Sequence, residues 1–228
     1  MERVSSGLSW LDEEIEKGLP KNKVTLLVGQ SGTGKTNFGL QFLKSGLYSD
    51  EKVAIFTAKE SPTQIKENIS NLGWNLEWAF EQDRFKIVDI RNYFEKAREE
   101  DIEMGFLNNF FLEIQNIVQA FNLKRLVFDP VIPQSVNISK KFYDRYLSEL
   151  TSFLEGRNLQ ATSLLVSAEA MDSQSLQEST ATNVIRMFFA KSNSVYKRTM
   201  FVQKMQNTYY EPKEIFFDIV YDKGLVRT

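Results

Sequence analysis

Short apolar runs alternate along the chain with longer segments in which apolar residues recur every three or four positions. The short runs predict strands at 23–28, 52–57, 85–89, 125–129 and 162–167. The periodic segments predict helices at 37–43, 106–121 and 142–154. Ser61-Pro62-Thr63-Gln64 has the residues of a helix start with a capping box. Strands that alternate with helices indicate an α/β fold of three layers, with helices on both faces of a mostly parallel sheet.

The C-terminal part of the chain has a different pattern. Residues 195–202 and 213–220 have β-type content with no helix between them, and Asp222-Lys223-Gly224 is a turn signal before two more apolar residues. We therefore expect antiparallel strands at one edge of the sheet. The segment 160–194 has the weakest pattern, and its part rich in Ser, Gln and Thr, 167–183, is expected to form a loop.

Composition narrows the class of protein. A chain of 228 residues, 42% of them hydrophobic, forms one well-buried core, so a single domain over residues 1–228 is expected. Cysteine and histidine are both absent, which excludes disulfides, thiolate metal sites and imidazole catalysis. The net charge of −2 does not favour strong nonspecific binding to nucleic acid. There is no long uncharged apolar run and no signal-like start, so we expect a cytoplasmic protein without membrane association.

The segment from Gly29 to Thr36 matches the pattern Gly-x-x-x-x-Gly-Lys-Thr, between the first predicted strand and the first predicted helix. Its glycines allow backbone torsions that turn successive amides toward phosphate, and the helix start adds its positive dipole end. Lys35 supplies a cation to the terminal phosphates, and the Thr36 hydroxyl is placed to ligate Mg²⁺. Nucleotide contacts are expected from Gly29, Gln30, Ser31, Gly32, Thr33, Gly34, Lys35, Thr36 and Asn37. The alternative is a simple glycine turn, which the flanking strand and helix disfavour.

Asp129 closes the predicted strand 125–129 and is the candidate second ligand for Mg²⁺. An acidic residue at the end of a later strand can hold the metal's shell in this class of site. An aspartate before Pro130 also suits an ordinary turn, so the strand end alone leaves both interpretations open.

Several segments, in their order along most of the chain, resemble the KaiC-like branch of RecA-type ATPases. They are Ser6-Gly7-Leu8, Leu11-Asp12, Gly18-Leu19-Pro20, the phosphate loop, Glu60-Ser61-Pro62, Asn71-Leu72-Gly73-Trp74, Asp129, Lys204-Met205 and Asp222-Lys223-Gly224-Leu225-Val226. The resemblance implies a RecA-like core that binds ATP with Mg²⁺ between neighbouring subunits of a ring or filament, often a hexamer.

Three positions depart from that family. Relatives carry two adjacent glutamates after the second strand, the first of which activates the attacking water, whereas this chain has Lys59-Glu60. A protonated lysine cannot act as that base. Relatives also place an arginine two residues after the equivalent of Lys204, and both cations reach the neighbour's terminal phosphate, but Gln206 stands here. Pro130 replaces a serine that usually follows the aspartate.

Glu60 is the remaining candidate for the base, with Lys35 as the second catalytic candidate. An extended segment would point the Glu60 side chain to the opposite face from residue 59, so catalysis by Glu60 requires a local change of backbone direction. Glu60 also suits the positive end of the helix that follows, and this alternative stays open. Ser167-Ala168-Glu169 ends a strand where relatives often have a polar residue that senses the terminal phosphate, and a solvated strand end is the competing interpretation.

The residues needed to hold phosphate are intact and those needed for hydrolysis are altered. The sequence therefore predicts a protein that binds ATP and Mg²⁺, hydrolyses ATP slowly, and acts through a nucleotide-linked homo-oligomer or a protein partner. Two alternatives stay open: an ATP-dependent switch without hydrolysis, and a recombinase-like protein associated with DNA. The C-terminal strands also carry a group of basic residues, Lys191, Lys197, Arg198 and Lys204. Three interpretations of this group stay open: it faces the nucleotide of a neighbouring subunit, it binds an acidic partner, or it is a solvated sheet edge.

Overall fold

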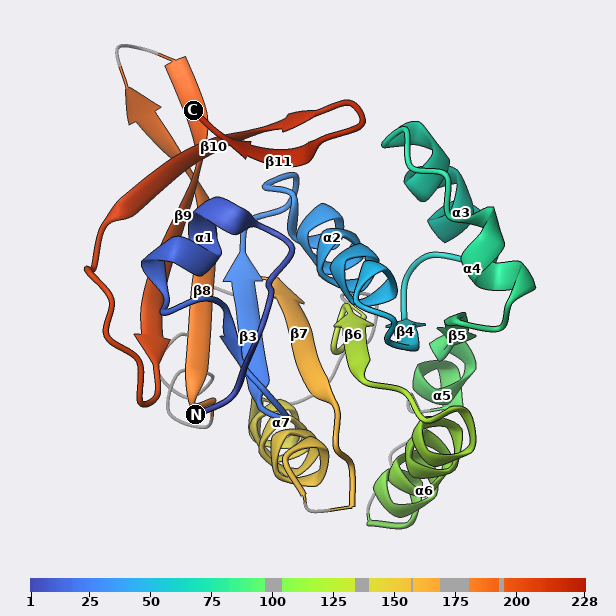
Figure 1. Ribbon diagram of the computed structural model, residues 1–228. Coiled ribbons are helices and arrows are strands. Elements are labelled where there is room, and N and C mark those ends of the chain that lie inside the picture. Colours follow the sequence, from blue (N-terminus) through green and yellow to red (C-terminus); the bar gives the residue numbers. More distant parts are fainter. Residues whose placement is uncertain (97–103, 134–139, 157, 169–180, 193–194) are drawn as a thin grey trace.

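The computed structural model describes residues 1–96, 104–133, 140–156, 158–168, 181–192 and 195–228. Within these ranges a nine-stranded sheet runs through the molecule in the order β11-β10-β9-β8-β3-β7-β6-β4-β5 (Figure 1). Its strands are β3 Val24–Gly29, β4 Val53–Thr57, β5 Phe85–Asp89, β6 Arg125–Asp129, β7 Thr162–Ala168, β8 Asn183–Ser192, β9 Val195–Met205, β10 Glu214–Val220 and β11 Gly224–Arg227. A small separate sheet pairs β1 (Arg3–Val4) with β2 (Leu19–Pro20).

The central strands are parallel and the C-terminal ones antiparallel. The parallel neighbours are β8 with β3, β3 with β7, β7 with β6, β6 with β4, and β4 with β5. Strands β8 to β11 form an antiparallel meander at one edge. This architecture confirms the predicted α/β fold with C-terminal antiparallel strands.

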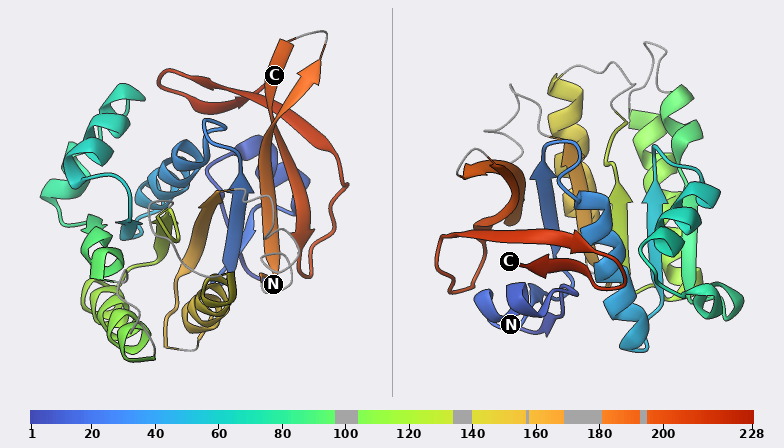
Figure 2. Two further views of the ribbon diagram at one scale, coloured as in Figure 1. Left: turned by 180° about the vertical axis from the view of Figure 1, so that it is seen from behind. Right: turned by 90° about the horizontal axis from the view of Figure 1, so that it is seen from above.

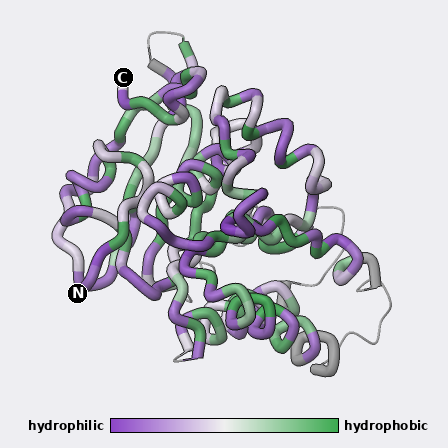
Figure 3. Tube along the Cα trace, turned by 45° about the vertical axis from the view of Figure 1, so that its right-hand side comes forward, coloured by the Kyte–Doolittle hydropathy of each residue, from purple (hydrophilic) through white to green (hydrophobic). Residues whose placement is uncertain are grey.

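Two layers of helices cover the sheet on opposite faces (Figure 2). The helices are α1 Ser9–Glu14, α2 Lys35–Tyr48, α3 Pro62–Asn71, α4 Glu77–Glu81, α5 Arg91–Lys96, α6 Met104–Phe121 and α7 Lys140–Leu154. Buried side chains of α1 to α4 pack against one face, and those of α5 to α7 form a second core on the other. Apolar positions follow the central strands and the inner faces of these helices (Figure 3). Phe38 and Phe42, one turn apart on α2, are both fully buried, so these two phenylalanines serve the core.

The five predicted parallel strands lie within one residue of the observed bounds at each end. The predicted capping box is also present, because the Ser61 hydroxyl accepts from the Gln64 amide and the Gln64 side chain accepts from the Ser61 amide. The prediction for 160–194 was incomplete, since residues 183–192 form β8 beside β3. Residues 169–180 of the expected loop lie outside the described residues. None of the described helices is long and apolar enough to cross a membrane.

Candidate nucleotide-binding site

The predicted phosphate loop joins the carboxyl end of β3 to the start of α2, at the centre of the sheet. Gly32 and Gly34 have φ angles of +79° and +102°, in the left-handed region that side chains disfavour. A Cβ at Gly29 would lie 2.0 Å from the Met187 carbonyl oxygen of β8. The loop can therefore take this path only with glycine at these positions, which explains the motif in physical terms.

The Lys35 side chain bends back across the loop that precedes it. Its ammonium donates to the carbonyl oxygens of Gly29 at 2.6 Å and Gln30 at 2.7 Å. The Thr33 hydroxyl closes the loop from the other side by donating to the Gln30 carbonyl at 2.9 Å. The loop thus holds a cation over its concave side, next to the amino end of a 14-residue helix.

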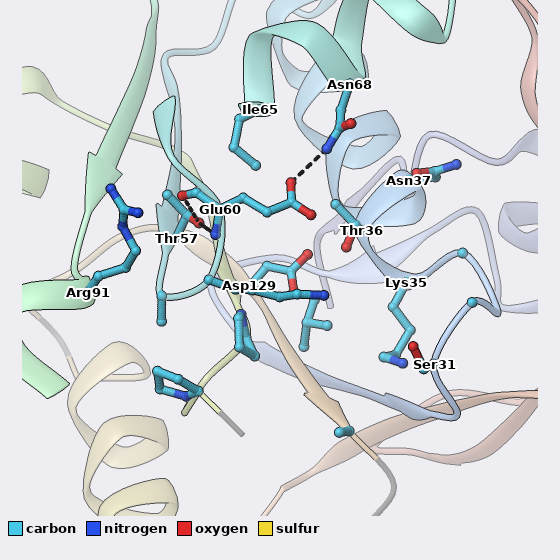
Figure 4. A pocket seen from close by; sticks show the side chains of 18 of the residues that line it. Ser31, Lys35, Thr36, Asn37, Thr57, Glu60, Ile65, Asn68, Arg91 and Asp129 are labelled. Carbon is cyan, nitrogen blue, oxygen red and sulfur yellow. Dashed lines mark hydrogen bonds between the residues drawn. The ribbon is translucent and has the colours of Figure 1, made fainter. Parts of the chain in front are cut away.

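A cavity of 690 Å³ opens beside this loop. Figure 4 shows Lys35, Thr36 and Asn37 on one side, Glu60 and Asn68 facing them, and Asp129 below. The expected site residues that line the cavity are Ser31, Gly32, Gly34, Lys35, Thr36, Asn37, Glu60 and Asp129. Gly29, Gln30 and Thr33 shape the loop behind this lining. The structure therefore gathers these residues, which are separated by up to a hundred positions, into one place.

Asp129 ends β6 directly across the cavity from Thr36. Burial raises the pKa of its carboxyl to about 6, and the nearby Glu60 carboxylate adds to the increase, while the Thr36 hydroxyl, Lys35 and Lys59 oppose it. Its Oδ2 atom is buried without a hydrogen-bond partner among the described residues. A buried carboxylate oxygen without a donor, beside a threonine hydroxyl, is a donor set that suits Mg²⁺.

Glu60 points into the cavity, toward Thr36 (Figure 4). Strand β4 ends at Thr57 and the chain bends over residues 58–60. The Thr57 hydroxyl fixes the bend, because it donates to the Glu60 carbonyl at 2.7 Å and accepts from the Glu60 amide at 3.0 Å. The Asn68 side chain of α3 donates to Glu60 Oε2 at 2.6 Å. The local change of backbone direction that catalysis by Glu60 requires is therefore present.

Sequence reasoning gave no role in the site to four polar residues that line the cavity, namely Thr57, Asn68, Asn71 and Arg91. Arg91 follows β5 and pairs with Asp89, and this hydrogen-bonded arginine lowers the pKa of the Asp89 carboxyl. The motif Asp-x-Arg at the end of β5 was a usable signal, because the carboxyl ends of parallel strands meet at one edge. Asn68 gave no signal, since its approach depends on the packing of α3, and Asn71 was noted only as part of the family resemblance.

Two other predicted positions lie away from this cavity. Lys204 pairs with Val184 at the amino end of β8, whereas the phosphate loop is next to Met187 further along that strand. Its ammonium donates to the Ala181 carbonyl at 2.8 Å. Ser167 shares a hydrogen bond with the Tyr143 hydroxyl at 2.8 Å, while its neighbours Val166 and Ala168 line the cavity. The Ser167 side chain thus faces α7, on the opposite face of the sheet.

Comparisons with known proteins agree with this geometry. Residues 4–226 match the family model described as ATPase: KaiC. A UPF0273 protein of Thermotoga maritima is 29% identical over 99% of this chain and 96% of its own length. The circadian clock oscillator protein KaiC of Parasynechococcus marenigrum is 32% identical over 58% of this chain but 25% of its own length. A crystal structure of a KaiC-like protein from Pyrococcus horikoshii has a TM-score of 0.83 at 27% identity, and the match covers 100% of this chain and 99% of that one.

Proposed function

Because the chain belongs to the KaiC family of RecA-type ATPases, we propose that it binds ATP with Mg²⁺ in the cavity beside the phosphate loop. One observation carries the proposal: Lys35, Thr36 and the buried Asp129 carboxylate line the same cavity, and Asp129 Oδ2 has no donor among the described residues. An unpartnered carboxylate oxygen and a threonine hydroxyl beside a cation suit a metal-bound polyphosphate.

Each part of the loop has a proposed task. The backbone amides of residues 29 to 37 surround the phosphates, and the Lys35 ammonium exchanges its two loop carbonyls for phosphate oxygens. Thr36 and Asp129 would hold Mg²⁺, and the bound cation would supply positive charge against the negative charge of the phosphates. The Mg²⁺ cation would offset the cost of the buried Asp129 carboxylate, so binding would also stabilise the fold.

Hydrolysis is proposed to be slow. Glu60 is a candidate general base, because its carboxylate lies in the cavity and accepts a hydrogen bond of 2.6 Å from the Asn68 side chain. Lys59 occupies the position of the base that the family resemblance implies, and Gln206 occupies that of an activating arginine. Loss of such an arginine lowers phosphoryl transfer by about 10³-fold or more in related enzymes. A switch that binds ATP without hydrolysing it is the second candidate, and these two substitutions favour it.

The other proposals concern assembly and partners. We propose that the chain is one domain over residues 1–228 that forms a homo-oligomer, or recruits a protein partner, when ATP is bound. An association with DNA has less support, because the net charge is −2. Salt-sensitive binding to single-stranded DNA would favour it over a protein partner.

The first test measures phosphate release and nucleotide binding by the purified protein with Mg-ATP. Wild type should bind ATP and release phosphate slowly, whereas Lys35→Ala should lose both because it removes the loop cation. Glu60→Gln separates the two candidates. If wild type releases phosphate and Glu60→Gln binds ATP without releasing it, the protein is an ATPase with Glu60 as its base. Binding without release by wild type would establish the switch, and absence of binding would refute both.

A further inference from the structure

Two cations besides Lys35 line the cavity: Arg91, which pairs with Asp89, and Lys59, whose position is independent of the phosphate loop. Lys59 lies in the bend after β4, its side chain is exposed, and it lines the same cavity as Lys35 and Asp129. Among the described residues, no carboxylate or carbonyl oxygen forms an ion pair or hydrogen bond with its ammonium.

The location of Lys59 defines which phosphate it would meet. In the proposed site the loop would surround the phosphates next to α2, and Thr36 and Asp129 would hold the metal. Lys59 follows β4, which lies on the side of β6 away from β3, so its backbone is farther along the cavity from the phosphate loop than Asp129 is. A phosphoryl group that extends from the loop toward Asp129 would therefore lead toward Lys59.

We propose that the Lys59 ammonium binds the γ-phosphate of ATP within one subunit and makes the site selective for ATP over ADP. The inference rests on the proposed binding of ATP. ADP lacks the group that extends past the metal, so it cannot use this cation. Lys204, the other candidate phosphate contact, is at the opposite end of β8 and β9 from the chain's own loop, so it cannot supply this charge in the same subunit.

The chain offers a matched control on the same strand. Lys52 directly precedes β4 at the amino edge of the sheet, while Lys59 follows β4 by two residues at the carboxyl edge. Neither side chain forms an ion pair with another described residue. Each alanine substitution removes one lysine charge, but only Lys59→Ala removes it from the cavity beside the phosphate loop.

The experiment is a titration of wild type, Lys59→Ala, Lys59→Arg and Lys52→Ala with a non-hydrolysable ATP analogue and with ADP, each with Mg²⁺. Lys59→Ala should weaken the analogue about tenfold, as expected for loss of one charge-assisted hydrogen bond, and change ADP less than about twofold. Lys59→Arg should retain the preference, and Lys52→Ala should change neither ligand. The selectivity should also be independent of protein concentration, because the contact is internal to one subunit.

If Lys59→Ala lost affinity equally for the analogue and for ADP, or lost none for the analogue, the proposal would be overturned, while the proposed nucleotide site would stand. A selectivity that appears only at high protein concentration would overturn it as well, because it would require a neighbouring copy. Failure of wild type to bind either ligand would refute the proposed function instead, so the two failures are distinguishable.

Discussion

The ionisation of Asp129 links the candidate site to the stability of the fold. Its folded pKa of about 6 lies above the unfolded value of about 3.9, so the native state favours the protonated form. The native state therefore has its full stability below the unfolded pKa, where the Asp129 carboxyl is protonated in both states. It loses stability as pH rises through the folded pKa, because the buried carboxyl must then ionise. In the ligand-free protein, Asp129→Asn should therefore raise the free energy of unfolding at pH 7.5 by about 1–3 kcal/mol, with a smaller effect at pH 4.5. Urea unfolding at both values measures this.

Asp89 supplies the control with the opposite sign. Its pKa is lowered by the hydrogen-bonded Arg91, so its charged form stabilises the native state above the unfolded pKa. Asp89→Asn should lose stability at pH 7.5, where Asp129→Asn gains it. A loss for both variants would show that the buried Asp129 carboxylate is not under electrostatic strain. With Mg-ATP added, wild type should gain stability and Asp129→Asn should gain less.

Single residues also show what the sequence could and could not predict about the site. The glycine loop, Lys35, Thr36 and Asp129 were recognisable because each follows from a local pattern at a strand end. The direction of Glu60 was not, because alternation along an extended segment predicts the opposite face. Its actual direction depends on the hydrogen bonds from Thr57 and on Asn68, which a neighbouring helix brings near.

At the scale of elements, α3 connects a local sequence signal to the cavity. Ser61 caps the helix that carries Asn68, and the Gln64 side chain completes the box. Ser61→Ala should lower the free energy of unfolding by about 1 kcal/mol. Ser70→Ala, at an exposed position in the last turn of the same helix, should have almost no effect. Thermal unfolding of the two variants measures the difference, and an equal response would exclude capping as the cause.

Strand β8 shows why one element escaped prediction. Its stability comes from pairing with β3 on one side and β9 on the other. Asn183, a residue that disfavours strands, begins β8 because its buried side chain donates to the Val24 carbonyl and accepts from the Gln206 amide. Such tertiary contacts leave no periodic signal in the sequence, whereas the strands between helices do.

At the scale of the whole molecule, one side chain joins both ends of the chain to the helix of the phosphate loop. Gln41 of α2 donates to the Gly7 carbonyl at 3.0 Å and the Lys223 carbonyl at 3.3 Å, and accepts from the Leu225 amide at 2.8 Å. These hydrogen bonds join residues near the beginning and the end of the chain to the same helix, whereas in a two-domain chain those residues would belong to different domains. They support the proposed single domain, with the nucleotide site at its centre.

The proposed assembly makes a geometric demand on that domain. A ring or filament uses a heterologous contact, in which two different surfaces of the same subunit meet. Lys204 and the phosphate loop are at different ends of the β8–β9 pair, so Lys204 can reach a phosphate only in a neighbouring copy. It would then exchange the Ala181 carbonyl for phosphate oxygens. Sedimentation velocity should show a larger mass with Mg-ATP than without.

Lys204→Ala tests this arrangement because it removes the contact from one surface and leaves the other intact. The variant should need about tenfold more protein to assemble with Mg-ATP, as expected for one charge-assisted contact, and its subunits should still bind ATP. Lys124→Ala is the control, because Lys124 lies at the same amino edge of the sheet but several strands from β9. If Lys204→Ala assembles like wild type, the neighbour does not contact the phosphate through this lysine, and the interface must use another surface.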